Sequence, residues 1–385
     1  MVFCLRGVLA LQKAAKQLKE IDSAMTYYTR RRKRAKRRQY ELRRLRRLAK
    51  TKPRKKSYHN SLHVQSKIIS GGITSHEERT PFFQLTAPPD FRLLKNTEGC
   101  ISFFKKLRSR DYAYKSEDGI LRLLIDLRYV QHIDFASTML LESICDELEK
   151  TKPICFIYGN APVRSSCRQY LKDSGFLNNK VDMTGRPYEL STTSENMKIA
   201  KGNEKLKDDQ IKKFADMEKR IYKHISGCEG QEYKRIEIIK EICGNTVDWS
   251  KAEHDQWSFG MKFEEDKVIV VALDLGQGIL ESISRNFTEY IKDMLDNNSH
   301  VDILEGAFNR KYGSKSKQTY RNRGLPSIKH ANTLGHIKDL IVLTNNVILD
   351  FTTSEKSRKF ANHRNRAFSG TLYSWIVDSS CIKSK

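Results

Sequence analysis

The stretch Lys267–Leu280, KVIVVALDLGQGIL, decides how the C-terminal part of this 385-residue chain folds. Residues 268–273 are a continuous run of apolar and mostly β-branched side chains, which predicts a buried strand. The strand ends at Asp274, and two glycines spaced by one residue, Gly276 and Gly278, follow. Glycines permit positive φ and close backbone approach, and a carboxylate accepts hydrogen bonds from an exocyclic amine. The pattern predicts a turn that lies against a planar ligand, and a plain β-turn is the alternative.

A helix is predicted over Tyr233–Trp249, YKRIEIIKEICGNTVDW. Glu241, Asn245 and Asp248 are spaced at i, i+4 and i+7, so their side chains project from one face. A carboxylate one helical turn from an amide can activate a water molecule and hold Mg²⁺, which takes oxygen ligands. The alternative is an ordinary amphipathic helix with a polar outer face. Four residues are expected to face a core on the opposite side: Ile239, Ile242, Cys243 and Thr246.

The chain after the first stretch continues the pattern of a nucleotide site. Residues 307–323 are polar and basic, and Gly324 then opens a predicted helix. A glycine at a helix start leaves backbone N–H groups free, and nearby cations supply counter-charge, which together suit a phosphate chain. Strands are predicted over 337–344 and 347–353. Gly370-Thr371 leads into a last strand over 372–377.

The order Glu241-x-x-x-Asn245-x-x-Asp248, Asp274-x-Gly276-x-Gly278, Arg323-Gly324-Leu325 and Gly370-Thr371 resembles the GHKL ATP-binding fold. That family includes gyrase-type topoisomerases, MutL proteins, heat-shock ATPase chaperones, histidine kinases and anti-sigma kinases. The resemblance implies an α/β sandwich that binds ATP and Mg²⁺. It also implies a lid before the helix that Gly324 opens, although this family usually carries two or more glycines there and this chain carries one.

The resemblance assigns a role to each matching position. It makes Glu241 the catalytic base that activates water, Asn245 the Mg²⁺ ligand and Asp274 the acceptor of the adenine amine. It also places further residues around the nucleotide: Asp248, Gly276, Gly278, Ile279, Lys315, Ser316, Arg323, Gly324, Leu325 and Thr371.

The preceding part of the chain, residues 61–195, predicts a second α/β unit. Strands over 121–127 and 154–158 alternate with helices over 135–148 and 163–171, which implies a sheet covered by helices. Residues 125–138, IDLRYVQHIDFAST, followed by CFIYGN and DSGF, resemble the STAS domain of anti-sigma-factor antagonists. Switching members of that family carry a phosphate-acceptor serine where this chain has Phe135. Ser137 and Thr138 are therefore predicted to cap the following helix rather than accept a phosphate.

Residues 1–60 form a basic arm that is predicted to be helical. They hold 21 Lys and Arg against 3 Asp and Glu, a net charge of +18, which leaves +7 of the chain's +25 for the other 325 residues. Such a charge density predicts contact with a polyanion through residues 13–56. The partner is a nucleic acid or an acidic protein, and a solvated basic tail is the other alternative.

Composition places the protein in the cytoplasm. No apolar run approaches the roughly 20 residues that cross a bilayer, so no membrane span is expected. The eight cysteines include no C-x-x-C pair, which favours reduced thiols. The expected fold is α/β (α+β), with an arm over 1–60, a STAS-like domain over 61–195 and a GHKL domain over 196–385. Homodimerisation is an expectation from the family resemblance.

Three functions follow from these patterns. The first is a Mg²⁺-dependent GHKL ATPase whose lid state controls a partner. The second is an anti-sigma-type protein-serine kinase, which the neighbouring STAS-like unit favours. The third is a nucleic-acid-binding scaffold that acts through the basic arm and is not an enzyme.

Overall fold

Strand β9, Lys267–Asp274, is the predicted buried strand, and both of its faces are covered. Val268, Val270 and Ala272 pack into one apolar cluster, together with residues of several helices. Val271 and Leu273 point the other way and belong to a second cluster. Because neighbouring side chains on a strand point to opposite faces, a strand that is buried on both sides needs a continuous apolar run. The sequence pattern therefore has a direct structural cause.

The structure is a computed structural model of the chain. It describes residues 68–70, 81–109, 121–151, 155–177, 180, 182, 188, 197–202, 204–249, 257–286, 300–310, 324–361 and 367–382. The chain divides into two units, Met1–Val64 and Gln65–Lys385, and every described residue belongs to the second. The predicted basic arm thus lies outside the described residues.

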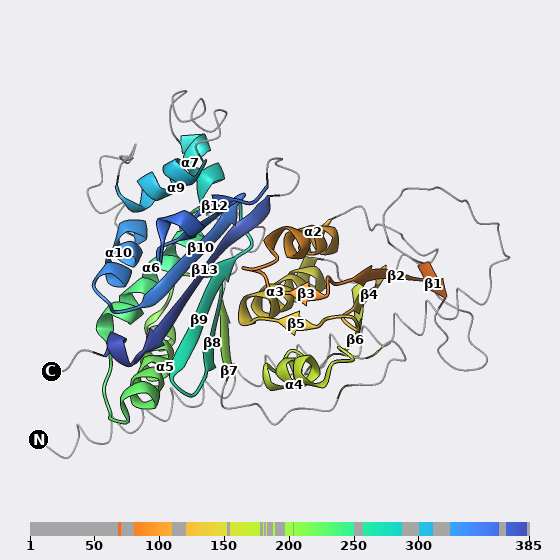
Figure 1. Ribbon diagram of the computed structural model, residues 1–385, viewed down its shortest axis with the longest axis horizontal. Coiled ribbons are helices and arrows are strands. Elements are labelled where there is room, and N and C mark those ends of the chain that lie inside the picture. The colour runs from red at the N-terminus through yellow and green to blue at the C-terminus, as the bar shows by residue number, and fades with distance from the viewer. Residues whose placement is uncertain are drawn as a thin grey trace, which may run out of the picture. The chain divides into compact units, whose positions relative to one another are not determined.

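Within the described part of the chain, seven strands form an antiparallel sheet in the order β12-β11-β10-β13-β9-β8-β7 (Figure 1). The strands that join β9 are β7 Met197–Gly202, β8 Trp257–Phe263, β10 Lys338–Asn345, β11 Val347–Asp350, β12 Arg358–Lys359 and β13 Phe368–Asp378. Strands β8 and β9 form a hairpin, in which the Glu264 N–H donates to the Lys267 carbonyl at 2.8 Å. The strands predicted over 337–344, 347–353 and 372–377 correspond to β10, β11 and β13.

Helices pack on one face of this sheet. They are α5 Asp208–Ser226, α6 Tyr233–Trp249, α7 Ile279–Asn286, α9 His300–Phe308 and α10 Gly324–Thr333. Their apolar side chains share one cluster with alternate residues of β8, β9, β10 and β13 (Figure 1). Arg235 of α6 connects several parts of this layer. It forms a buried ion pair with Glu218 of α5 at 2.6 Å, and it donates to the carbonyls of His336 and Cys381. Cys381 belongs to the short helix η4, Ser379–Cys381.

The N-terminal part of the described chain forms a smaller sheet in the order β1-β2-β4-β6. Its strands are β1 Ile68–Ser70, β2 Pro81–Thr86, β4 Leu121–Asp126 and β6 Cys155–Asn160, of which the last three run parallel. The helices here are α2 Thr97–Arg108, α3 Phe135–Thr151 and α4 Ser165–Asp173. A parallel pair, β3 Asp90–Phe91 and β5 His132–Ile133, lies in the connecting segments. The strand-helix alternation predicted for residues 121–171 is confirmed.

Helix α3 also contacts the seven-stranded sheet, on the face opposite the helical layer. Ser143 Oγ donates to Ser258 Oγ of β8 at 2.8 Å, and both side chains are buried. A Cβ atom on Gly260 would lie 2.5 Å from the sulfur of Met139 and 2.8 Å from the ring of Phe135, so the glycine makes room for α3. Lys201 of β7 pairs with two acidic residues of α3. The second face of the large sheet is therefore part of the core.

The architecture is mixed α/β, in agreement with the coarse fold class predicted. None of the helices that the structure describes combines the length and the apolar character needed to cross a membrane.

Candidate functional site

Asp274 ends β9 beside two threonines on neighbouring strands. Thr371 of β13 is its register partner, and Thr344 of β10 is in turn the partner of Thr371. Each of the three is two residues away, on its own strand, from a side chain that packs against the helical layer. These side chains are Ala272, Tyr373 and Val342. By strand alternation, all three side chains therefore lie on the face that the helices cover. They form one row at the end of three adjacent strands.

The Asp274 carboxylate is buried and held by local donors. The Gly276 N–H donates to Asp274 Oδ1 at 2.8 Å, and the hydroxyl and backbone N–H of Thr371 also stabilise the charged form. Burial nevertheless dominates and raises the pKa of Asp274 from 3.8 to about 6, while these donors and the positive charge of Arg108 oppose the rise. At neutral pH the group is a buried, oriented hydrogen-bond acceptor.

The turn after Asp274 is fixed by side chains from the end of β10. Asn345 Oδ1 accepts from the Leu280 N–H at 3.0 Å, and its Nδ2 donates to the Gln277 carbonyl at 2.9 Å. The Ile279 N–H donates to Thr344 Oγ1 at 2.9 Å. Gly278 has φ of +82°, and a Cβ there would lie 2.5 Å from Asn345 Oδ1, so this position needs glycine.

Gly370, near the start of β13, lies against the end of β9. Its φ is +141°, and a Cβ atom would lie 2.2 Å from the Asp274 carbonyl oxygen, which no other residue type could accommodate without moving the backbone. Its carbonyl accepts a hydrogen bond from Thr344 Oγ1 at 3.0 Å. The turn 274–278 and residues 369–371 of β13 therefore form one backbone assembly around the Asp274 carboxylate.

Helix α6 presents the predicted polar face. Glu241 and Asp248 are exposed and Asn245 is half-buried, whereas the four residues predicted to face the core are buried: Ile239, Ile242, Cys243 and Thr246. Asp248 forms an ion pair with Lys205 at 2.7 Å. The predicted orientation of the helix is confirmed.

The start of α10 lies against Glu241 and Asn245. A Cβ atom on Gly324 would be 2.8 Å from Glu241 Oε2 and 3.0 Å from Asn245 Nδ2. Because Gly324 has no Cβ, both polar side chains can lie against the first turn of a helix, whose N–H groups have no partner within the helix. The positive end of the helix dipole stabilises the Glu241 carboxylate there.

The remaining predicted residues have simpler positions. Leu325 and Ile279 pack their side chains against the core of the helical layer. Lys315, Ser316 and Arg323 lie outside the described residues. Thr344, Asn345 and Arg108 were not predicted as part of the site. A role for Thr344 and Asn345 could have been indicated by their position as two polar residues at the end of a strand.

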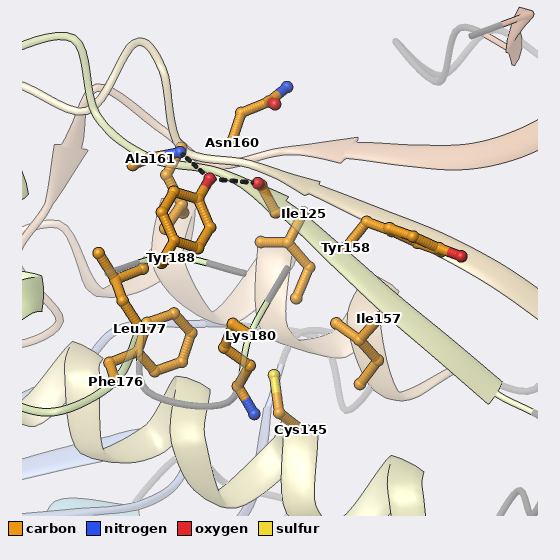
Figure 2. A pocket seen from close by; sticks show the side chains of 12 residues that line it. Ile125, Cys145, Ile157, Tyr158, Asn160, Ala161, Phe176, Leu177, Lys180 and Tyr188 are labelled. Carbon is orange, nitrogen blue, oxygen red and sulfur yellow. Dashed lines mark hydrogen bonds between the residues drawn. The ribbon is translucent and has the colours of Figure 1, made fainter. Parts of the chain in front are cut away.

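A separate cavity of about 20 Å³ lies in the N-terminal region, lined by β4, β6, Cys145 of α3 and four later residues, Phe176, Leu177, Lys180 and Tyr188. Its walls are mainly apolar, and Tyr188 closes one side by donating to the Gly159 carbonyl at 2.6 Å and accepting from the Ala161 N–H at 3.1 Å (Figure 2). This volume suffices for about one water molecule. The cavity is therefore too small for a nucleotide.

Among the described residues, no group of three or more His, Cys, Asp or Glu side chains is placed to hold a metal ion. In the comparisons with known proteins, no protein-family model, no curated protein and no solved structure matches this chain.

Proposed function

We propose that this protein binds ATP together with Mg²⁺ and hydrolyses it slowly, as a regulatory ATPase of the GHKL type. The observation that carries the proposal is the approach of Gly324 to both Glu241 and Asn245, at 2.8 and 3.0 Å from the position of its missing Cβ. Two sequence motifs that are far apart in the chain, Glu241-x-x-x-Asn245 and Arg323-Gly324, thereby meet on the helical face of one sheet.

The base of the nucleotide belongs at Asp274 in this proposal. Its buried carboxylate accepts a hydrogen bond from the exocyclic amine of adenine, an interaction that guanine cannot offer at the same position. Thr371 beside it supplies a hydroxyl. The backbone of Gly276 and Gly278 lies flat enough for a planar ring to approach.

The phosphates belong between α6 and the first turn of α10. Magnesium ions in nucleotide enzymes use one or two protein oxygens plus oxygens of the substrate phosphates. The Asn245 amide oxygen is such a ligand, and the free N–H groups after Gly324 can bind phosphate oxygens. Bound Mg²⁺ would neutralise phosphate charge at this position.

Glu241 is the general base in this scheme. Its side chain is exposed and lies one helical turn from Asn245, so its carboxylate can accept a proton from a water molecule aimed at the terminal phosphate. The released proton stays on Glu241 until solvent removes it. A carboxamide at position 241 would keep the shape of the side chain but could not accept that proton.

ATP binding and hydrolysis control how this protein interacts with a partner. In this proposal ATP binding changes the state of the lid that precedes α10 and so alters a docking surface. The basic residues 13–56 contact a nucleic acid or an acidic protein. We further propose a cytoplasmic location, from the reduced thiols that the cysteine pattern favours, and a homodimer, by analogy with the GHKL family.

The environment of Ser137 and Thr138 argues against self-phosphorylation, the simplest form of the kinase alternative. Ser137 and Thr138 are both completely buried at the start of α3. Each hydroxyl donates to the Asp134 carbonyl at 3.0 Å, and the Ser137 N–H donates to Asp134 Oδ1 at 2.7 Å. Asp134 therefore caps α3, whereas Ser137 and Thr138, which were predicted to cap it, lie in its first turn with both hydroxyls bonded to the backbone. A kinase of this type would need a substrate on another chain.

The fate of the terminal phosphate distinguishes these functions. The full chain is incubated with Mg²⁺ and ATP labelled at the terminal phosphate, and free phosphate and protein-bound label are both measured. Wild type should release phosphate, and Glu241→Gln should lose at least about a hundredfold in rate while retaining ATP binding. Glu237→Gln, one turn earlier on α6 and paired with Lys234, is the matched control and should keep the wild-type rate.

Two results would contradict the proposal. Equal rates for wild type and Glu241→Gln would remove Glu241 from the mechanism. Label transferred to a protein, with no release of phosphate, would establish the kinase instead.

A further inference from the structure

Arg108, the last residue of α2, connects the N-terminal region with the backbone next to Asp274 and Thr371. Its Nε and Nη2 donate to the two carboxylate oxygens of Glu147 on α3, each at 2.8 Å. Its Nη1 donates to the Ser369 carbonyl at 3.0 Å and its Nη2 to the Leu275 carbonyl at 3.0 Å. One guanidinium therefore uses its planar fork on one side and binds two backbone carbonyls on the other.

Both carbonyls belong to residues next to the candidate site. Leu275 directly follows Asp274, and Ser369 directly precedes Gly370-Thr371. The guanidinium thus bridges the turn after Asp274 and the first residues of β13, which precede Thr371. These two segments touch each other, because the Asp274 carbonyl lies 2.2 Å from the position of a Cβ atom on Gly370. The bridge adds two hydrogen bonds at this close contact.

Glu147 holds the guanidinium in place from the opposite side. The pair is about one quarter exposed, at 23% for each side chain. Bidentate pairs between arginine and a carboxylate are directional, so Glu147 fixes the plane of the fork as well as neutralising its charge. Helix α3, which carries Glu147, packs on the large sheet through Ser143 and Ser258. The bridge is therefore anchored in a buried part of the core.

The charge of Arg108 also reaches the Asp274 carboxylate. It favours the ionised form and opposes the effect of burial on the pKa of Asp274. Tyr373 of β13 lies on a neighbouring strand, and its pKa is raised by burial and by the charge of Asp274, so it is neutral at physiological pH. Arg108 supplies a positive charge that acts on Asp274.

We infer that Arg108, held by Glu147, is a positioning residue through which the N-terminal α/β region sets the affinity of the Asp274 site for the adenine base. This inference rests on the proposed ATP-binding function and deepens it. It assigns regulation of base binding to α2 and α3, which contribute no residue to the predicted phosphate site. A change in the packing of α2 would alter nucleotide affinity without touching the hydrolytic group.

The test measures Mg-ADP affinity and ATP turnover in the full chain for wild type, Arg108→Gln, Glu147→Gln and Asp274→Asn. Arg108→Gln should raise the Kd for ADP about tenfold and raise KM for ATP, with kcat nearly unchanged, because the phosphate end is intact. Glu147→Gln should raise the Kd by less. Arg92→Gln, which breaks a similar two-bond pair with Asp90 within the N-terminal region, is the matched control and should bind as wild type.

A pH profile separates positioning from general loss of structure. Because Arg108 favours the Asp274 carboxylate, its removal should move the pH midpoint of ADP affinity upward. Arg108→Lys keeps a charge but loses the fork, so its affinity should weaken while its midpoint stays near that of wild type. This variant also serves if Arg108→Gln does not fold.

The outcomes are distinct. If Asp274→Asn weakens ADP binding while Arg108→Gln binds with the wild-type Kd and midpoint, the inference is overturned and the proposed function stands. If wild type binds no adenine nucleotide, the proposed function fails and the inference fails with it.

Discussion

At the scale of single residues, Asp274 is a carboxylate whose chemistry is strongly altered by the fold. A carboxylate loses its hydration on burial, and only part of that loss is returned by the Gly276 N–H, Thr371 and the charge of Arg108. Its pKa of about 6 lies far above the ordinary 3.8. Buried carboxylates with such shifts concentrate at functional sites.

Asp274 makes nucleotide affinity depend on pH. The carboxylate accepts from the adenine amine better when ionised, so affinity should fall as the pH drops through about 6, by up to tenfold per pH unit. The measurement is ADP binding between pH 5 and 8 for wild type and Asp274→Asn, because the difference between them removes the titration of the phosphates. Parallel profiles for the two proteins would contradict this role.

The contribution of Asp274 to the free energy of unfolding should decrease as the pH rises, whereas nucleotide affinity should increase. Because the pKa of Asp274 is raised in the folded state, the folded protein binds this proton more tightly than the unfolded chain does. The contribution of Asp274 to the free energy of unfolding is therefore largest below about pH 4 and is lost as the pH rises through about 6. The group costs stability at the pH where it would bind nucleotide best, as expected for a functional residue.

At the scale of elements, α6 and α10 meet at a glycine. Gly324→Ala would place a methyl group 2.8 Å from Glu241 Oε2 and 3.0 Å from Asn245 Nδ2. Both are ends of flexible side chains, so they can move aside, and alanine favours helix by up to about 1 kcal/mol over glycine. The melting temperature should therefore stay constant or rise slightly, while ATP turnover falls roughly tenfold to a hundredfold.

The control for this variant is Thr333→Ala at the opposite end of α10, where the side chain is exposed. It should change neither quantity appreciably. Thermal unfolding and steady-state phosphate release on the three proteins check the prediction. Full turnover in Gly324→Ala would show that the space beside Glu241 is not used.

The elements also show what local sequence can predict. The bounds of α6 and the buried strand β9 followed from periodicity, because each has a consistent apolar pattern along its own length. Asp274 and Gly276 are two residues apart, so their hydrogen bond is local and their role could be anticipated. Asn345 contacts Leu280 across 65 positions of sequence, and that pairing depends on the register of the sheet. Periodicity contains no such information.

At the scale of the whole molecule, the large sheet is covered on both faces. Phe135 is buried and lies against Gly260 of β8, at the position where switching STAS domains carry an acceptor serine. The sequence predicted that a phosphorylation switch here was doubtful, but it did not predict that this helix would pack on the next sheet. The same long-range packing brings Arg108 to the site, and no local pattern marks an arginine for that contact.

The basic arm should make the whole protein a salt-sensitive binder of polyanions. Residues 1–60 carry a net charge of +18, and counterion release makes such binding to nucleic acid fall steeply with salt. Replacing the eight basic residues of Arg30–Arg38 by glutamine should reduce affinity of the full chain for DNA or RNA at least about tenfold at 0.1 M salt. Filter binding across a salt series checks this. Affinity that is independent of salt would exclude an electrostatic arm.

The most direct test of the central claim is the ATP affinity of Asp274→Asn. The matched control is Asp266→Asn, which makes the same chemical change in the exposed hairpin turn at the other end of β9. Isothermal titration with Mg-ATP should give wild-type affinity for Asp266→Asn and an affinity at least about tenfold weaker for Asp274→Asn, because a hydrogen bond to a charged group is lost. If Asp274→Asn binds ATP as tightly as wild type, Asp274 does not recognise adenine and the assignment of a GHKL-type nucleotide site is wrong.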